Sequence, residues 1–217
     1  MSFDVAISRV HDFGKRFLRF FYRLPFSPFR GIVYRMLRSE TKTILDAGCG
    51  FGEASEAIKI RNPSLHIIGA EVSLERLCSA KKRGFLDDSV LCDIRYLPFR
   101  NSSVDTVLCI EVIEHLKKTE GVHVLKDLEI IGCKQVIVTT PVGYAKEPST
   151  VSGIDFLKHI SGWTPLEFKG RGYKVRGMIG PKMSILPNFV AYWISFIFCP
   201  TYFLPNLSYV MICVKIR

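Results

Sequence analysis

The feature that most constrains the fold is the run Asp46-Ala47-Gly48-Cys49-Gly50-Phe51-Gly52, which joins a short apolar segment to a helical one. Residues 43–47 have the pattern of a buried strand, and residues 52–61 that of a helix which Asn62-Pro63 ends. Glycines between a strand and a helix let the backbone approach a ligand at the helix N-terminus. The run therefore predicts a nucleotide-like cofactor on an α/β fold.

The rest of the chain continues to alternate short apolar runs with helical segments, which is typical of a parallel sheet with helices on both faces. A length of 217 residues with 48% hydrophobic residues suits one domain with its own core. Further strands are predicted at 66–71, 90–93, 103–110, 135–139, 173–177 and 209–214, and helices from Ser73 to Gly84, from about Glu114 to Ile131 and after Thr164. We divide residues 1–217 into a basic, aromatic N-terminal extension (1–42), a cofactor-binding core (43–180), a hydrophobic insertion (181–206) and a last strand (207–217).

Acidic residues stand at the ends of the first three predicted strands, on the edge where open α/β sheets bind ligands. Glu71 is placed to accept hydrogen bonds from both ribose hydroxyls of a cofactor. Asp93 can accept from the exocyclic amine of an adenine, and Ile94 can pack on its ring. Asp46 and Glu53 would repel a dinucleotide phosphate, whereas an ammonium and a sulfonium suit them. The pattern favours S-adenosylmethionine over NAD.

Two other classes of protein remain open on these residues alone. A nicotinamide oxidoreductase would need the third glycine one position later, where this chain has Glu53. A scaffold that binds the cofactor without catalysis would keep the glycine loop and lack a competent acceptor pocket.

Four segments together resemble the class I S-adenosylmethionine-dependent methyltransferases: residues 44–55 (ILDAGCGFGEAS), 69–73 (GAEVS), 91–116 and 135–141 (QVIVTTP). The resemblance implies a Rossmann-like, seven-stranded, mostly parallel sheet with helices on both faces. Its final, antiparallel strand enters between strands five and six. The resemblance also implies the cofactor-binding residues, which are Asp46, Gly48, Cys49, Gly50, Gly52, Glu71, Val72, Asp93, Ile94 and Glu111.

The segment Glu111-Val112-Ile113-Glu114-His115 follows the fourth predicted strand, where the methyl group would be delivered. It is similar to a segment of the small-RNA 2'-O-methyltransferases and the ubiquinone-pathway O-methyltransferases, where such side chains hold a divalent metal. His159, followed by Trp163-Thr164, matches the His-x-x-x-Trp-Thr of the small-RNA enzymes. The resemblance thus implies metal ligands at Glu111, Glu114, His115 and His159, and catalytic roles for Glu114, His115 and His159. Without a metal, His115 or His159 would act as general base.

Charge and hydropathy are unevenly distributed along the chain. The net charge is +10, and residues 1–42 carry nine basic residues against three acidic ones. Residues 13–34 interleave aromatic and basic side chains, a pattern that suits an anionic membrane surface, nucleic acid, or packing over the cofactor cleft. Residues 183–214 carry no charge, and prolines break them into pieces too short to cross a bilayer. This run could meet a membrane interface, cover the substrate pocket or form a dimer contact.

These observations lead to one expected function, methyl transfer from S-adenosylmethionine to an oxygen of a small or lipid-linked acceptor near a membrane. RNA 2'-O-methylation is the alternative. The seven cysteines include no C-x-x-C pair, as in reduced intracellular proteins. We therefore expect a cytoplasmic protein, peripheral at an anionic membrane surface, with S-adenosylmethionine and a divalent metal as cofactors.

Overall fold

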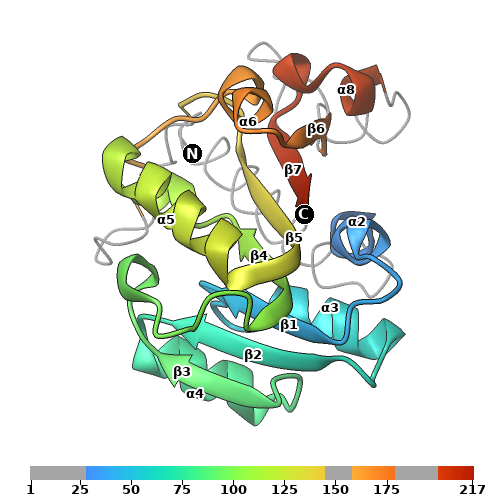
Figure 1. Cartoon of the computed structure of the whole chain (residues 1–217), viewed down its shortest axis with the longest axis vertical. Coiled ribbons are helices and arrows are strands. Elements are labelled where there is room, and N and C mark those ends of the chain that lie inside the picture. The colour runs from blue at the N-terminus through green and yellow to red at the C-terminus, as the bar shows by residue number, and fades with distance from the viewer. Residues whose placement is uncertain (1–27, 145–157, 179–199) are drawn as a thin grey trace, which may run out of the picture.

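A seven-stranded sheet forms the centre of the computed structural model, which describes residues 28–144, 158–178 and 200–217 (Figure 1). The strands pair in the order β3-β2-β1-β4-β5-β7-β6. Pairs among β1 to β5 are parallel, whereas β7 is antiparallel to both β5 and β6. The predicted Rossmann-like sheet, with its last strand antiparallel between strands five and six, is confirmed.

The strands are β1 (Thr43–Ala47), β2 (His66–Glu71), β3 (Asp88–Leu91), β4 (Val104–Ile110), β5 (Gly132–Pro141), β6 (Lys174–Gly177) and β7 (Val210–Ile216). The helices are α2 (Pro28–Met36), α3 (Glu53–Arg61), α4 (Leu74–Lys82), α5 (Lys118–Ile131), α6 (Pro165–Gly170) and α8 (Pro200–Phe203). Short 3-10 turns are η1 (Ile94–Tyr96), η2 (Ile113–His115) and η4 (Pro205–Leu207).

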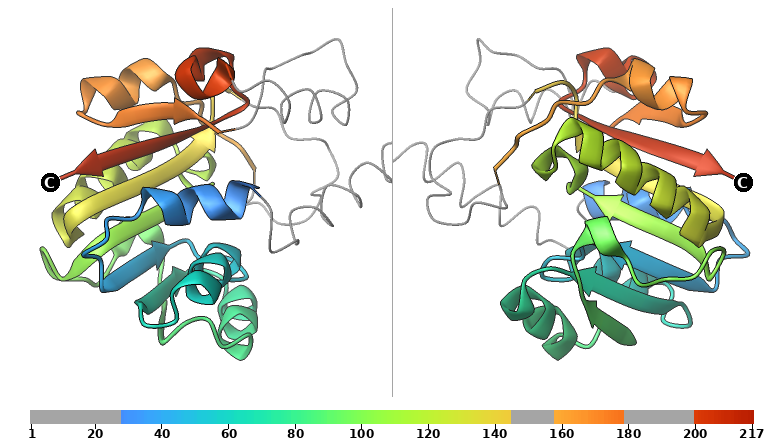
Figure 2. Two further views of the ribbon diagram at one scale, coloured as in Figure 1. Left: turned by 90° about the vertical axis from the view of Figure 1, so that its right-hand side faces the viewer. Right: turned by 60° about the vertical axis from the view of Figure 1, so that its left-hand side comes forward.

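Successive residues of the central strands belong to two separate buried clusters, because side chains alternate between the faces of a sheet. Leu45 and Val107 lie in the cluster that includes the buried side of α5. Their neighbours Ile44 and Leu108 lie in the cluster that α2, α3 and α4 complete. Figure 2 shows α5 against one face and α2 against the other. Strands buried on both faces explain why the sequence shows continuous apolar runs here.

Local capping explains where two of the helices begin. Ser73 precedes α4, and its hydroxyl accepts a hydrogen bond from the backbone N–H of Arg76. Thr164 precedes α6, and its side chain and that of Glu167 bond each other's backbone N–H, with Pro165 at the first helical position. Both helix starts were predicted from these residue types.

Two of the boundaries that differ from the prediction lie beside the site. Strand β3 covers residues 88–91 and not 90–93, because Asp93 accepts a hydrogen bond from the N–H of Arg95 and begins the turn η1. The helix expected from about Glu114 begins only at Lys118. Glu111 has a left-handed φ of 54°, and the next residues form η2 instead of a helical turn. Glu111, Glu114 and His115 therefore do not share an α-helical turn.

Most of the N-terminal extension and of the hydrophobic insertion lies outside the described residues, including residues 188–199, the longest proline-free stretch of the insertion. The insertion's last residues form α8 and η4 beside the edge strand β6. Six cysteines fall in the described ranges, and each is a free thiol. In the part of the chain that the structure describes, no helix combines the length and the apolar character needed to cross a bilayer.

Candidate active site

The glycine loop after β1 is held by a carboxylate from the end of β2. Gly48, Gly50 and Gly52 all have positive φ, a conformation that glycine adopts without steric cost. The N–H of Gly50 donates to Glu71 Oε2 at 2.9 Å, and the N–H of Ser73 donates to Glu71 Oε1 at 3.0 Å. Glu71 is 5% exposed, so its carboxylate has a defined position beneath the loop.

A cavity of about 460 Å³ opens at the carboxyl ends of β1, β2 and β4. Six of the ten predicted cofactor residues line it: Gly48, Glu71, Val72, Asp93, Ile94 and Glu111. The other four are Asp46, Cys49, Gly50 and Gly52, which do not line the cavity. The lining also includes residues that the sequence reasoning did not assign to the cofactor: Ala70, Arg76, Cys92, Arg95, Val112, His115, Leu116, Lys117, Glu120 and Ile160. The cavity joins the first three strand ends to the segment after β4.

Asp46 lies behind the cavity wall, in the interior. It is 1% exposed, and the hydroxyl of Ser55 in α3 donates to its Oδ2 at 2.6 Å. Burial raises the pKa of Asp46 to about 6, an effect that the hydrogen bond from Ser55 opposes. Asp46 therefore stabilises the start of α3 and sets the charge behind the loop. Because Asp46 is buried, it would act on a bound cofactor through its electrostatic field and not through direct contact.

Arg95 is a site residue that the sequence reasoning missed. Its guanidinium contacts both carboxylate oxygens of Asp93, and its Nη1 lies 3.0 Å from Glu120 Oε1 in α5. The hydrogen bonds from Arg95 hold the pKa of Asp93 below its usual range, although partial burial opposes them. An adenine amine would thus meet an ionised Asp93. No local sequence pattern predicts the pairing of Arg95 with Glu120, because 25 residues separate them.

Glu111 stands where the cavity meets the segment after β4. Its side chain is exposed to the cavity, yet surrounding protein replaces most of the bulk water and raises the pKa of its carboxyl. Its backbone N–H donates to Thr139 of β5, which stabilises the left-handed turn. A carboxylate at this point favours a cationic ligand, as predicted for the cofactor.

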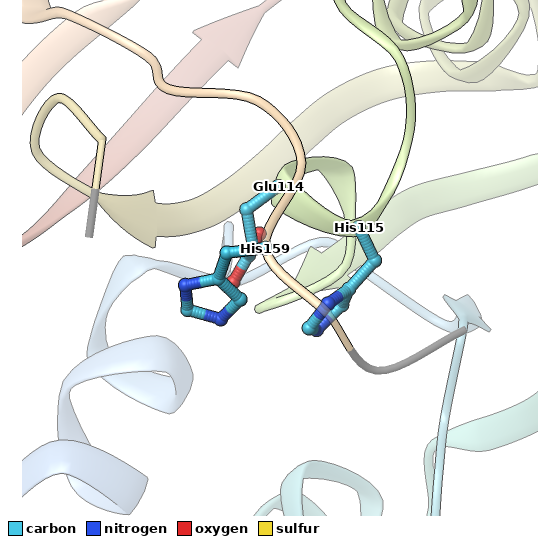
Figure 3. Close-up of side chains that lie close together, drawn as sticks. All are labelled: Glu114, His115 and His159. Carbon is cyan, nitrogen blue, oxygen red and sulfur yellow. The ribbon is translucent and has the colours of Figure 1, made fainter. Parts of the chain in front are cut away.

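Glu114, His115 and His159 form a group whose ligand-type atoms lie within 4.8 Å of one another (Figure 3). The imidazole rings of His115 and His159 are 4.9 Å apart between centroids. Glu114 is 2% exposed, and the hydroxyl of Thr140 donates to its Oε2 at 3.1 Å. Three of the four predicted metal-site residues are thus brought together. Glu111 is not a member of this group.

The tautomer of His115 follows from its neighbour. Its Nδ1 lies 3.2 Å from the carbonyl oxygen of Lys158, and a carbonyl can only accept. The proton of the neutral ring is therefore on Nδ1, which leaves the lone pair on Nε2. That nitrogen is the one available to take a proton or to bind a cation. Because His115 also lines the cavity, the lone pair belongs to the same site as the cofactor residues.

A comparison with family models and known proteins agrees with this geometry. Residues 45–128 match the family model described as a methyltransferase domain. An uncharacterized protein of Methanocaldococcus jannaschii is 33% identical over 84 residues, which are 38% of this chain and 34% of that protein. The malonyl-[acyl-carrier protein] O-methyltransferase of Xylella fastidiosa is 36% identical over 81 residues, 35% of this chain and 28% of its own length. The chain thus spans about a third of the curated relatives it matches.

Solved structures share the fold across more of the chain. The magnesium protoporphyrin IX methyltransferase of Synechocystis PCC 6803 with bound SAH has a TM-score of 0.58 and 14% identity, over 93% of this chain and 87% of that one. The small RNA methyltransferase HEN1 has a TM-score of 0.60 and 20% identity, over 87% of this chain and 24% of that one. Residues 45–128 thus match a methyltransferase domain, and the chain shares the Rossmann-like fold of these solved methyltransferases.

Proposed function

We propose that this chain transfers the methyl group of S-adenosylmethionine to an oxygen atom of a small or lipid-linked acceptor. The observation that carries the proposal is that His115 lines the same cavity as Glu71 and Asp93. A cofactor whose ribose and adenine meet those two carboxylates would present its methyl group beside an imidazole. An oxygen acceptor needs a base there, whereas a scaffold that only binds the cofactor has no use for one.

The reaction is an in-line displacement, in which the acceptor oxygen forms a bond to the methyl carbon as the carbon–sulfur bond breaks. The sulfur keeps the bonding electron pair and leaves as a neutral thioether. The proton of the acceptor hydroxyl passes to Nε2 of His115, the nitrogen that holds the lone pair. The protein otherwise aligns acceptor, methyl and sulfur and excludes water from the site. Burial raises the pKa of Glu111, and a cationic cofactor beside its carboxyl would favour the charged form.

As the alternative, in which Nε2 of His115 binds a cation instead of taking the proton, we propose that Glu114, His115 and His159 hold a divalent metal. The residues fit such an ion, because two imidazoles and a carboxylate make a mixed nitrogen and oxygen set suited to Mn²⁺, Fe²⁺ or Zn²⁺. When bound, the cation would lower the cost of deprotonating the acceptor hydroxyl. Mg²⁺ fits less well because it prefers oxygen ligands, and this group has one carboxylate. Glu111 is the residue that could add a second.

The acceptor class is proposed from the surface around the site. Ile160 lines the cavity beside His115 and is 51% exposed, and Tyr144 nearby is 62% exposed, with its hydroxyl donating to the carbonyl of His159. An apolar or aromatic acceptor would pack on these side chains. The small RNA methyltransferase among the similar folds favours RNA as the second candidate, since a charge of +10 also suits phosphates.

A position at a membrane surface, on the cytoplasmic side, is proposed from the far edge of the sheet. Phe203 and Leu207 are 73% and 54% exposed on α8 and η4. These elements contact the edge strand β6, where Lys174 and Arg176 point outward. No acidic residue occurs from 168 to 217. Exposed apolar side chains beside cations suit anionic headgroups and would bring the enzyme to a lipid-linked acceptor.

Product analysis tests the proposal. Purified protein with methyl-labelled S-adenosylmethionine should label a phenolic or lipid fraction of a membrane extract and leave small RNA unlabelled. Label in RNA alone would select the second candidate, and absence of label in every fraction, despite measured cofactor binding, would favour a binding scaffold.

A second experiment tests whether His115 acts as a base and whether a cation is required for turnover. His115→Ala should remove turnover while calorimetry shows unchanged cofactor affinity, and His123→Ala on the outer side of α5 is the matched control. Loss of turnover in chelator, restored by Mn²⁺ or Zn²⁺, would support the cation. Full turnover in chelator, with no metal in the purified protein, would leave His115 as a base alone.

A further inference from the structure

The segment that carries His159 is bonded to η2, the turn that carries Glu114 and His115, although some 45 residues separate them. The N–H groups of Ile160 and Ser161 both donate to the carbonyl of Glu114, at 2.9 and 3.1 Å. The hydroxyl of Ser161 donates to the carbonyl of Ile113 at 3.2 Å. His159 therefore has no support from a helix or strand of its own, and these bonds define its place opposite His115.

Trp163 completes this connection from inside the core. It is 1% exposed, and its indole Nε1–H donates to Ser161 Oγ at 3.1 Å and lies 3.4 Å from the carbonyl of Ile113. Because Ser161 uses its own proton towards Ile113, the indole N–H is the donor that orients the hydroxyl. The Trp163 indole N–H, the Ser161 hydroxyl and the Ile113 carbonyl form a chain of hydrogen bonds from the core to η2, which we call the relay.

The surroundings of Trp163 hold the indole in one orientation. Gly121 in α5 leaves room for the ring: a Cβ at Gly121 would lie 2.6 Å from Cζ2 of the indole. The Lys118 ammonium lies 3.7 Å from the ring centroid, donates to the carbonyl of Gly162 and pairs with Glu167 at 2.7 Å. The backbone of Trp163 also bridges to Val142 and Gly143 after β5. A buried ring that is packed against these groups has a fixed position.

We propose that Trp163 and Ser161 are positioning residues that set the separation of His159 from His115 through this relay. Neither residue lines the cavity, so each acts through the histidine and not on the ligands. The proposal rests on the proposed function only in the catalytic use of His159, since the geometry itself can be measured without substrate. A displacement of about 1 Å in a reacting group can cost on the order of a hundredfold in rate.

The test compares Trp163→Phe, which keeps an aromatic ring and removes the N–H, with Ser161→Ala, which removes the hydroxyl and leaves the indole. In wild-type protein, ring protons of His115 and His159 should show a nuclear Overhauser effect, because the centroids are 4.9 Å apart. Each variant should weaken that effect and lower kcat about ten- to a hundredfold. The KM for S-adenosylmethionine should stay unchanged. The double variant should have a kcat no lower than that of the more impaired single variant. Both substitutions break the same chain of hydrogen bonds, so their effects should not add.

Tyr173→Phe is the matched control. Tyr173 belongs to the same buried cluster and donates to Glu129 at 3.0 Å, near the other end of α5. The control variant should have a lower melting temperature, with the histidine signal and kcat as in wild type. If Trp163→Phe fails to fold, Ser161→Ala decides alone.

A wild-type histidine signal and kcat in folded Ser161→Ala would overturn the proposal. Equal loss of kcat in Tyr173→Phe and in the relay variants would also overturn it, since the effect would then follow stability alone. Failure of the proposed function looks different: His159→Ala would keep full turnover, whereas the nuclear Overhauser measurement would still report whether the relay holds His159 in place.

Discussion

The backbone N–H of Gly50 donates a hydrogen bond to Glu71 Oε2 across 2.9 Å, which ties the glycine loop after β1 to the end of β2. The other carboxylate oxygen of Glu71 accepts from the N–H of Ser73, directly before α4. One buried carboxylate thus orders the loop and the start of a helix, and it lines the cavity as well. These two hydrogen bonds give the carboxylate a defined position beside the cavity.

Replacing Glu71 with Gln should weaken cofactor binding and stability together. The amide keeps the size of the side chain, but its NH2 group would face an N–H donor where an oxygen now accepts. We expect the Kd for S-adenosylmethionine to rise at least tenfold, or about 1.4 kcal/mol by calorimetry. Glu75→Gln, on the exposed side of α4, is the control. Equal affinities for the two variants would contradict a ribose role for Glu71.

Replacing Gly48 with Ala should cost more than the same change at Gly84. Both glycines have positive φ, 79° and 77°, so each substitution carries a similar backbone cost of about 1 kcal/mol. A Cβ at Gly48 would also lie 2.5 Å from Cγ2 of Val112, whereas no atom lies within 4 Å at Gly84. Because Gly48 and Val112 both line the cavity, only Gly48→Ala should weaken cofactor binding. Thermal unfolding and calorimetry measure both effects, and similar values for the two variants would show that Val112 simply moves aside.

Replacing Asp46 with Asn should change how stability depends on pH. Burial raises the pKa of Asp46 from 3.8 to about 6 in the folded protein, so the protonated carboxyl favours folding. This contribution is present below about pH 3.8 and is lost as the pH rises through 6. The amide of the Asp46→Asn variant does not titrate. The variant should therefore gain stability relative to wild type as the pH rises from 5 to 8, by about 1.4 kcal/mol, which corresponds to roughly one pKa unit.

Urea unfolding without cofactor at the two pH values measures this gain at Asp46. The control is Asp88→Asn, whose carboxylate is exposed on β3. Parallel pH profiles for Asp46→Asn and wild type would show that Asp46 has an ordinary carboxyl in the folded chain.

Charging the apolar residues at the sheet edge should reduce binding to anionic vesicles. Phe203→Asp with Leu207→Asp should lower the bound fraction at least tenfold, because each exposed side chain would insert apolar surface into the interface. Lys174→Glu with Arg176→Glu should remove the salt-sensitive part of binding. Ile60→Asp is the control, since Ile60 is 55% exposed on α3. Flotation with unchanged binding in both double variants would assign membrane contact to another part of the chain.

Several site residues were predictable because their signals are local. The glycines, Glu71 and Asp93 follow apolar runs that end at one edge of a parallel sheet, and strand ends are readable from such runs. The helix starts at Ser73 and Thr164 follow from side chains that bond the adjacent backbone. The turn η2 was missed because the EVIEH segment has no residue that signals a left-handed φ, which Glu111 adopts here.

The sequence by itself determined the strand and helix pattern, the glycine loop and the acidic strand ends, because those depend on residue type and spacing over short distances. Only the tertiary structure decided which side chains meet. It placed Asp46 behind the cavity, paired Arg95 with Glu120, and brought His159 to His115 through Ser161 and Trp163. The residues in these contacts are 9 positions apart for Asp46 and Ser55, 25 for Arg95 and Glu120, and 44 for His115 and His159. Such pairs depend on how helices and loops pack on the sheet, and local propensity carries no information about that packing.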